Sequence, residues 1–177
     1  AGMELVVMEA SSHALDQKRL YGLWFEAAAF TNLTRDHLDY HKTMEAYFEA
    51  KKKLFSMADY AVVNIDDEYG RRILEGNPVE RATYSAADSG ADYFAGQISC
   101  EADGVRFDLS HANVQSRVSF GIPGLYSVHN ALAAIACCMR LGVSLDTILE
   151  GLRQIGTIQG RNELIYAGGD FRVICDY

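Results

Sequence analysis

Short runs that are apolar at consecutive positions alternate with helix-type segments along the first half of the chain, and this alternation limits the fold more than any other feature. Consecutive apolar residues are typical of strands that are buried on both faces. The expected strands are residues 4–10, 25–32, 60–65 and 82–85. The expected helices between them are residues 43–57 and 69–74. Because strand–helix–strand units pair in parallel through right-handed connections, we predict an α/β fold with a mostly parallel sheet flanked by helices.

The second half of the chain changes to short alternating segments and then returns to helices. Three strands separated by turn residues predict a small antiparallel β insertion, at residues 94–100, 105–110 and 115–120. The expected helices are residues 128–139, with Ser127 as N-cap, and 145–155. Two further strands are expected at residues 163–167 and 171–177, around a Gly168-Gly169-Asp170 turn. We therefore predict a domain boundary near Gly160, with residues 1–159 in one domain and residues 160–177 opening the next.

Composition restricts the class of protein. With 177 residues, of which 49% are hydrophobic, the chain can form one globular domain with a sizeable core. A formal net charge of -8 gives no electrostatic reason to expect nucleic-acid binding. No apolar run reaches the roughly 20 residues of a membrane span, and the four cysteines show no zinc-ligand spacing. We expect a cytoplasmic protein without a membrane span and, because the chain begins at Ala1 rather than methionine, a piece of a longer polypeptide.

Lys51 lies on the apolar stripe of the helix expected at residues 43–57, seven positions after Met44 and three before Leu54. Burial disfavours the ammonium form, and the neutral amine can act as a base or react with carbon dioxide to give a carbamate, an oxygen ligand for Mg²⁺. The alternative is a lysine whose stem covers apolar surface while its ammonium reaches water.

Polar side chains that suit metal or phosphate follow two of the expected strands. Glu9 ends the first, where phosphate-transfer folds place a metal-holding acid, although it could also support the N-terminus of the next segment. His37 and His41 have helical i, i+4 spacing, but neither HExxH nor a cysteine pair is present, so contact of His37 with a hard metal or phosphate is favoured over zinc. Ser11, Ser12 and His13 suggest a hydrolase only weakly, because G-x-S-x-G is absent.

Three segments together resemble the Mur ligases of peptidoglycan synthesis. They are Met8-Glu9-Ala10-Ser11-Ser12-His13-Ala14-Leu15, residues 31–41 and Met44-Glu45-Ala46-Tyr47-Phe48-Glu49-Ala50-Lys51. The resemblance implies a central ATPase domain with a P-loop-NTPase-like fold at residues 1–159, truncated at both ends and lacking its first strand and P-loop, plus the opening strands of a C-terminal domain. The resemblance is densest at residues 9–55. It is strongest to the ligases that add a diamino acid, meso-diaminopimelate or L-lysine, to UDP-N-acetylmuramoyl-L-alanyl-D-glutamate through an acyl phosphate.

The resemblance also implies roles for individual residues, with ATP and Mg²⁺ as cofactors. Glu9 and His37 match the residues that hold Mg²⁺, and Lys51 matches the carboxylated lysine that supports a second metal. The positions that grip the UDP-muramoyl peptide correspond to Ser11, Gln17 and Arg19. Those that contact the nucleotide correspond to Asn130, Arg161 and Asp176. The implied partners are the UDP-muramoyl dipeptide and a diamino acid as substrates, with no obligate protein partner.

The chain departs from the family pattern at two positions, Asn162 and Gln159, where methionine and proline are usual, and neither is an implied ligand. Because no P-loop motif is present, we expect this chain alone not to hydrolyse ATP. Two other readings stay open: a related ligase of the folylpolyglutamate or cyanophycin synthetase type, which shares the central fold, and a non-catalytic binding domain.

Overall fold

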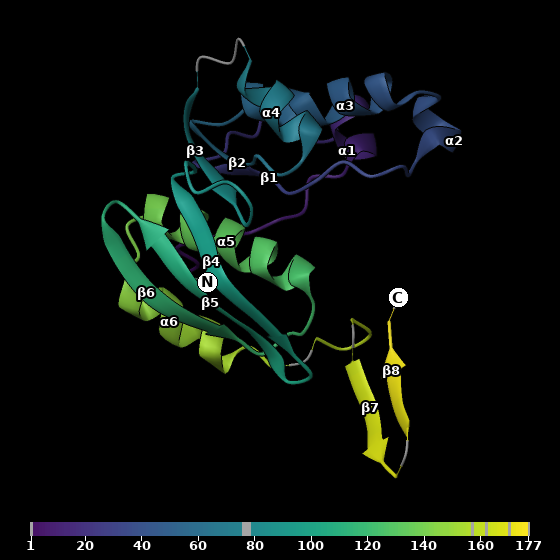
Figure 1. Ribbon diagram of the computed structural model, residues 1–177. Helices are drawn as coiled ribbons and strands as arrows, with labels where there is room; N and C mark the ends of the chain where they lie inside the picture. The colour runs from purple at the N-terminus through teal and green to yellow at the C-terminus, as the bar shows by residue number, and fades with distance from the viewer. Residues whose placement is uncertain (1, 76–78, 157, 162, 170, 177) are drawn as a thin grey trace.

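One six-stranded sheet organises the molecule (Figure 1). The computed structural model describes residues 2–75, 79–156, 158–161, 163–169 and 171–176. The strands, which lie side by side in chain order, are β1 (Ala28–Phe30), β2 (Tyr60–Asn64), β3 (Glu80–Ser85), β4 (Tyr93–Glu101), β5 (Gly104–His111) and β6 (Val114–Phe120). Pairing is parallel from β1 to β4 and antiparallel from β4 to β6. The expected α/β fold with a mostly parallel sheet is confirmed.

Helices cover both faces of the sheet. They are α1 (Ser12–Asp16), α2 (Leu38–His41), α3 (Met44–Lys52) with a following 3₁₀ turn η1 (Lys53–Ser56), α4 (Glu68–Leu74), α5 (Leu125–Arg140) and α6 (Leu145–Gln154). Thr43 caps α3 by accepting a hydrogen bond from the Ala46 N–H, and Ser144 caps α6 in the same way through Thr147. The long α5 crosses one face and contacts every strand from β1 to β6, while α3 and α4 lie on the other face (Figure 1). None of the described helices is long and apolar enough to span a bilayer.

The burial of β2 shows why its residues are apolar without alternation. Successive side chains of a strand point to opposite faces. Val62 packs into the core beneath α5, whereas Ala61 and Val63 pack into a second core with Phe48 of α3 and Ile73 of α4. A strand sandwiched between two cores needs an apolar residue at every position, which is the pattern that predicted it.

The antiparallel strands extend the main sheet. The β3 strand pairs with β4 in parallel through Tyr84 and Tyr93, so the expected insertion continues the same sheet. Along β5, Val105, Phe107 and Leu109 are buried against the helices while the residues between them are less buried. This strict alternation is typical of a sheet with one covered and one open face.

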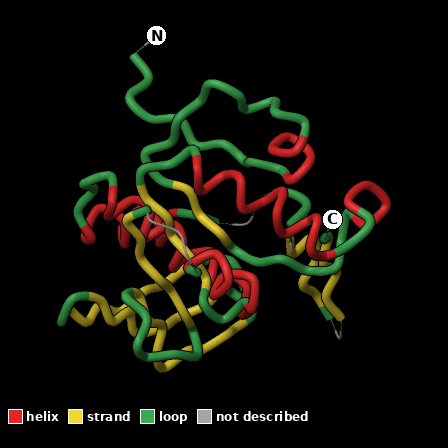
Figure 2. The backbone as a smooth tube through the Cα atoms, turned by 90° about the horizontal axis from the view of Figure 1, so that it is seen from above, coloured by secondary structure: helices red, strands yellow, loops and turns green. Residues whose placement is uncertain are grey.

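Two expectations are wrong. Residues 4–10 form no strand: they run as a loop away from the body (Figure 2), and Val7 is 88% exposed. A strand buried on both faces needs a hydrogen-bonded neighbour and cover on each face, and within the described chain this segment has neither. Ser127 is not the N-cap of α5, because the helix begins one turn earlier after Gly124. The buried Ser127 hydroxyl instead donates at 3.0 Å to the carbonyl of Pro123, which precedes the helix.

A two-stranded hairpin follows the main sheet. Its strands are β7 (Glu163–Gly168) and β8 (Phe171–Cys175), and Figure 1 shows it projecting away from the other elements. The expected strands are present, while Asp170 of the turn and the family departure at Asn162 lie outside the described residues. The domain boundary near Gly160 stays a prediction.

Replacing Tyr84 with phenylalanine should destabilise the fold by about 1–3 kcal/mol, because a buried carbonyl loses its donor. Tyr84 of β3 is fully buried, and its hydroxyl donates to the Phe30 carbonyl at 3.1 Å, which ties β3 to the end of β1. Urea unfolding measures the effect. Tyr93→Phe is the matched control, since its hydroxyl makes no hydrogen bond to another of the described residues. Equal losses in the two variants would contradict the assignment.

Candidate active site

Polar side chains gather where β1 and β2 end. The Asn64 amide at the end of β2 donates to the Thr31 carbonyl just after β1, at 2.7 Å. Asp67 accepts the Leu33 N–H through Oδ2 at 3.0 Å. These two bonds fix the chain that leaves β1 against the chain that leaves β2. In open α/β sheets the carboxyl ends of strands are where ligands bind, so this edge is the place to look for a site.

The start of α4 is clamped to the same edge. The other oxygen of Asp67, Oδ1, accepts the N–H groups of Tyr69 at 2.8 Å and Gly70 at 3.4 Å and so caps the helix. Gly70 lies so close to β2 that a Cβ atom there would sit 1.8 Å from the Asn64 carbonyl oxygen. A glycine is therefore needed for α4 to approach the strand end.

Lys51 is half-buried on α3 and lines a small cavity of about 30 Å³ beside Ala10 and Thr31. Burial lowers the pKa of its ammonium, and the negative charges of Glu9 and Asp67 partly oppose that effect. Its Nζ lies 5.7 Å from the centre of the Tyr47 ring. The lysine predicted on the apolar face thus sits at the strand-end edge with carboxylates near it, and its amine is easier to deprotonate than an exposed one.

Glu9 and His37 each lie near a residue of α3. Glu9 is exposed in the loop before α1, close enough for its charge to act on Lys51. His37, at the N-cap of α2 with a left-handed φ of 55°, places its ring 5.7 Å from that of Tyr47. Among the described residues no three His, Cys, Asp or Glu side chains are grouped to hold a metal ion. Within the described part of the chain, His, Cys, Asp and Glu side chains alone therefore do not form a metal site.

An aromatic and imidazole cluster supports His37, and sequence reasoning missed it. His13 of α1 lies with its ring centroid 5.1 Å from that of His37, 5.4 Å from that of His41 and 4.2 Å from that of Tyr40. His41 is buried and its Nε2 lies 2.9 Å from Ser12 Oγ. Burial, with the positive charge of His13 adding to it, lowers the pKa of His41. This hydrogen bond holds α1 to α2. Because the Ser12 hydroxyl is buried, it is not placed to act as a hydrolase nucleophile.

The three residues expected to grip the substrate lie on or just after α1. Ser11 is the N-cap of that helix, and its hydroxyl oxygen accepts the Ala14 N–H at 3.2 Å. The exposed Gln17 amide donates to the Tyr40 hydroxyl at 3.4 Å, and Arg19 is exposed two residues further on. Ser11 follows Glu9 by two residues in the chain, while Gln17 and Arg19 are open to solvent.

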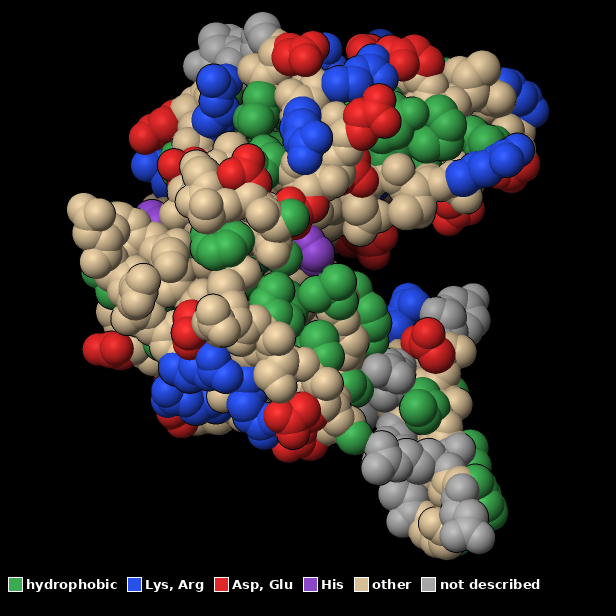
Figure 3. Space-filling view, viewed as in Figure 1, with side chains coloured by type: hydrophobic (Ala, Val, Ile, Leu, Met, Phe, Trp, Pro, Cys, Tyr) green, Lys and Arg blue, Asp and Glu red, His purple; other side chains and the backbone are tan. Residues whose placement is uncertain are grey.

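Asn130 lines a separate pocket of about 250 Å³ on the other side of the strand ends. The pocket is lined by Thr31, Asn32, Asn64, Asp66, Asp67, Tyr126, His129 and Asn130. These residues come from the ends of β1 and β2 and from the first turns of α5. The two other expected nucleotide contacts, Arg161 and Asp176, are exposed at the open end of the β7–β8 hairpin, where Glu163 pairs with Cys175. Figure 3 shows a deep indentation between that hairpin and the part of the molecule that carries α2 and α3.

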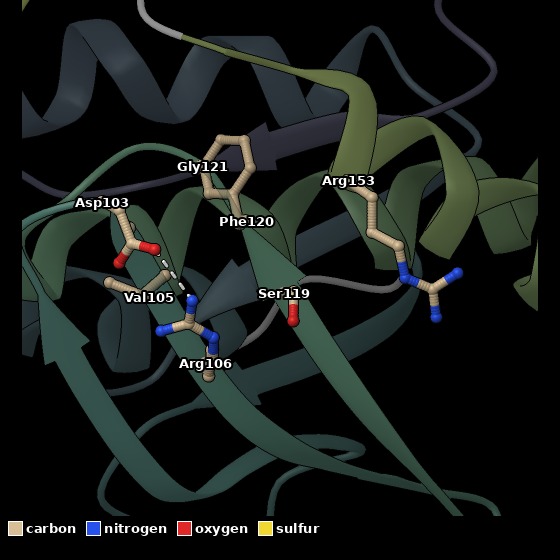
Figure 4. Close-up of a pocket in the computed structure, with 8 residues that line it drawn as sticks. Asp103, Val105, Arg106, Ser119, Phe120, Gly121 and Arg153 are labelled. Carbon is tan, nitrogen blue, oxygen red and sulfur yellow. Dashed lines mark hydrogen bonds and ion pairs between the residues drawn. The ribbon is translucent and has the colours of Figure 1, made fainter.

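A further pocket, of about 140 Å³, lies against β5, β6 and the end of α6 (Figure 4). Arg106 and Arg153 line it, but Arg106 is paired with Asp103 at 2.9 Å and Arg153 with Glu150 at 3.3 Å. Because both guanidinium groups already face carboxylates, this pocket offers an anionic ligand no uncompensated positive charge.

Comparison with known proteins agrees with this arrangement. Residues 1–138 match the family model of the Mur ligase middle domain. Two similar curated proteins are UDP-N-acetylmuramoyl-L-alanyl-D-glutamate--2,6-diaminopimelate ligases. The Clostridium acetobutylicum protein is 39% identical over 99% of this chain, and the Caldanaerobacter subterraneus protein is 42% identical over 99% of it. This chain spans 36% of the length of each.

A solved structure of a UDP-N-acetylmuramoyl-L-alanyl-D-glutamate--2,6-diaminopimelate ligase superposes with a TM-score of 0.82 and 33% identity, over 90% of this chain and 34% of that one. The family model matches more than half of the chain, and the fold agrees with it independently. The chain therefore belongs to the family of Mur ligase middle domains.

Proposed function

We propose that the protein containing this chain is an ATP-dependent, ADP-forming ligase that joins a diamino acid to UDP-N-acetylmuramoyl-L-alanyl-D-glutamate in the cytoplasm. The observation that carries the proposal is the half-buried Lys51 beside the carboxylate of Glu9, at the edge where β1 and β2 end. The names of the similar proteins favour diaminopimelate over lysine as the amino acid. The proposal includes no obligate protein partner.

The residues at this edge fit Mg²⁺. A hard cation prefers oxygen ligands, which Glu9 and a carbamate on Lys51 would provide, and His37 would add one nitrogen. Burial lowers the pKa of Lys51 and so enlarges the fraction of neutral amine. That amine forms a bond to the carbon of CO₂ and releases one proton, which leaves a negatively charged carbamate. When bound, the metal would neutralise charge on phosphate oxygens.

In the family reaction, two anionic substrates must be held so that the carboxylate of one can attack the γ-phosphorus of the other. The substrate carboxylate attacks the γ-phosphorus of ATP and ADP leaves; the incoming amine then attacks the acyl carbon, phosphate leaves, and the amine loses a proton. Ser11, Gln17 and Arg19 would bind the UDP-muramoyl dipeptide, because hydroxyl, amide and guanidinium donors suit anionic oxygens. The Ser11 hydroxyl accepts its capping bond and so keeps its own hydrogen to donate.

The nucleotide would lie on the opposite side of the strand ends. Asn130 lines the pocket there, and we propose that Arg161 and Asp176 complete it when the β7–β8 hairpin closes toward the main sheet. This chain by itself should not hydrolyse ATP, because it carries no G-x-x-x-x-G-K-[ST] segment to cradle the phosphates.

The test uses the full-length protein with ATP, Mg²⁺, UDP-N-acetylmuramoyl-L-alanyl-D-glutamate and either diaminopimelate or lysine. We expect phosphate release together with a new amide product, seen by mass, from diaminopimelate. The chain of residues 1–177 under the same conditions is the control and should release none. Turnover only with a folate or cyanophycin-type substrate would replace the proposal with the related ligase, and nucleotide binding without turnover on any of them would favour a non-catalytic domain.

A further inference from the structure

The helical turn that carries His37 depends on its neighbours for its shape. The α2 helix has four residues, and a helix this short is not stable on its own in water. Residues with positive φ flank it, His37 at 55° and Lys42 at 66°, and this backbone conformation is unfavourable for residues other than glycine. Contacts with other elements must therefore hold α2 in place.

His41, the last residue of α2, makes two such contacts. It is buried, with 7% of its surface exposed, and its Nε2 lies 2.9 Å from Oγ of the buried Ser12 on α1. Its ring stacks on that of Tyr47 on α3, with 5.1 Å between the ring centroids and 13° between the ring planes. One imidazole thus joins α2 to α1 by a hydrogen bond and to α3 by ring stacking.

The same two neighbouring helices also contact His37. The His41 N–H donates to the His37 carbonyl at 3.0 Å, so the two histidines close a single turn. The His37 ring lies 5.7 Å from the Tyr47 ring on which His41 stacks. The His13 ring of α1 meets the His37 ring edge-on, with 5.1 Å between their centroids. Where His41 docks α2 against α1 and α3 therefore determines where the His37 ring lies.

The two histidines differ in what they can reach. The side chain of His37 is 43% exposed and is open to a ligand. His41 is buried and already has Ser12 as a hydrogen-bond partner. Metal-binding histidines are commonly held in orientation by neighbouring groups that do not touch the metal themselves. The helical i, i+4 spacing of the pair therefore suits one residue that binds and one that supports it.

We propose that His41 is a positioning residue, which holds α2 through Ser12 and Tyr47 so that the His37 ring is kept in place for the metal ion. The inference rests on the proposed function and deepens it, since it names the residue that maintains the geometry of a proposed metal ligand. Loss of a group that orients a metal ligand lowers metal affinity by roughly 10- to 100-fold.

The experiment titrates Mn²⁺, a paramagnetic substitute for Mg²⁺, into the full-length protein and follows binding by electron paramagnetic resonance. In the pulsed experiment, an imidazole nitrogen bound to the ion gives a nitrogen modulation, which carboxylate and carbamate oxygens do not give. The wild type should show this modulation and His37→Ala should lose it. In His41→Phe, which keeps a ring to stack on Tyr47 but cannot bond Ser12, the affinity for Mn²⁺ should fall by about tenfold and the modulation should weaken.

Ser12→Ala removes the same hydrogen bond from the side of α1 and should have a similar effect. Because both substitutions act on one bond, the double variant should bind Mn²⁺ no more weakly than the weaker single variant. Ser12→Ala also carries the test if circular dichroism shows that His41→Phe does not fold. His111→Ala is the matched control, since that histidine lies on β5 with its ring stacked 3.9 Å from that of Tyr93 and should leave Mn²⁺ binding unchanged.

The outcomes separate the inference from the proposed function. If both variants keep the nitrogen modulation and the Mn²⁺ affinity of the wild type, even with a lower Tm, His41 has only a structural role and the inference falls alone. If the wild type shows no nitrogen modulation but releases phosphate with its substrates, His37 is not a metal ligand and the inference falls while the ligase stands. If the wild type releases no phosphate, the proposed function falls and the inference falls with it.

Discussion

Replacing Lys51 with methionine should lower ligase turnover of the full-length protein by roughly 10³-fold, the scale of losing one preorganised charge-stabilising group. Methionine keeps the length and volume of the side chain but has no amine to take up CO₂. Because Lys51 lies at the strand-end edge with Glu9 and Asp67 near it, the loss should appear in kcat more than in KM. Steady-state phosphate release measures both constants.

The same substitution should stabilise the fold at neutral pH, which distinguishes a functional lysine from a structural one. Burial lowers the pKa of Lys51 below its value in the unfolded chain, so the folded state is penalised wherever the amine is protonated. That penalty is fully present below the folded pKa and disappears as the pH rises toward the unfolded value of 10.5. Lys51→Met should therefore raise Tm at pH 7 and have a smaller effect near pH 10.

Lys52→Met is the matched control for both measurements. Lys52 is the next residue along α3, and its ammonium lies 3.8 Å from Glu49 in a partly exposed i, i+3 pair. Surface pairs of this kind contribute little to stability, so turnover should stay within about twofold and Tm should hardly change. A lysine at position 51 that only covers apolar surface would make the two variants behave alike, and that result would remove Lys51 from the site.

Replacing Gly70 with alanine should destabilise the fold by about 3 kcal/mol, or ~10 °C in Tm for a chain of this length. The added Cβ would lie 1.8 Å from the Asn64 carbonyl oxygen, and a backbone atom cannot rotate out of the way. Relief requires α4 to move from β2, which would also pull Asp67 away from the Leu33 N–H that it binds at 3.0 Å. Thermal unfolding of the two proteins gives the size of the loss.

Gly151→Ala is the control for helix propensity. Gly151 lies in α6 and nothing is within 4 Å of a Cβ placed there, so this substitution should stabilise the protein by about 0.5–1 kcal/mol. If Gly70→Ala destabilises the protein and Gly151→Ala stabilises it, the loss at position 70 comes from the close approach of α4 to β2 and not from replacing a glycine in a helix. Stabilisation by Gly70→Ala would contradict the packing described for α4.

Local sequence pattern was sufficient to predict features that depend on the periodicity of a single helix or strand. The consecutive apolar residues of β2 predict a strand between two cores, and the stripe on α3 predicts that Lys51 faces inward, because both depend only on periodicity. Ser127 shows the limit of this reasoning: a serine near a helix start is a good cap, but the apolar Leu125 and Tyr126 extend α5 by another turn.

Pairings between distant segments could not be predicted from the sequence. Asp66 and His129 are 63 residues apart and meet only because α5 crosses the ends of β2 and β3. His13 reaches His37 for a similar reason, through the packing of α1 against α3. The strand predicted at residues 4–10 is absent for a different reason. An apolar pattern indicates that a segment can form a buried strand, but it does not show whether a neighbouring strand is present to pair with it.

The loop before α1 has a consequence for handling the protein in solution. Its side chains from Leu5 to Met8 are all at least 45% exposed, and the edge of β1 has no neighbouring strand among the described residues. Exposed apolar residues and an open strand edge are each usual starting points for intermolecular association. The colloidal stability of any preparation of this chain is therefore set by what covers these few residues, and not by the two well-packed cores behind them.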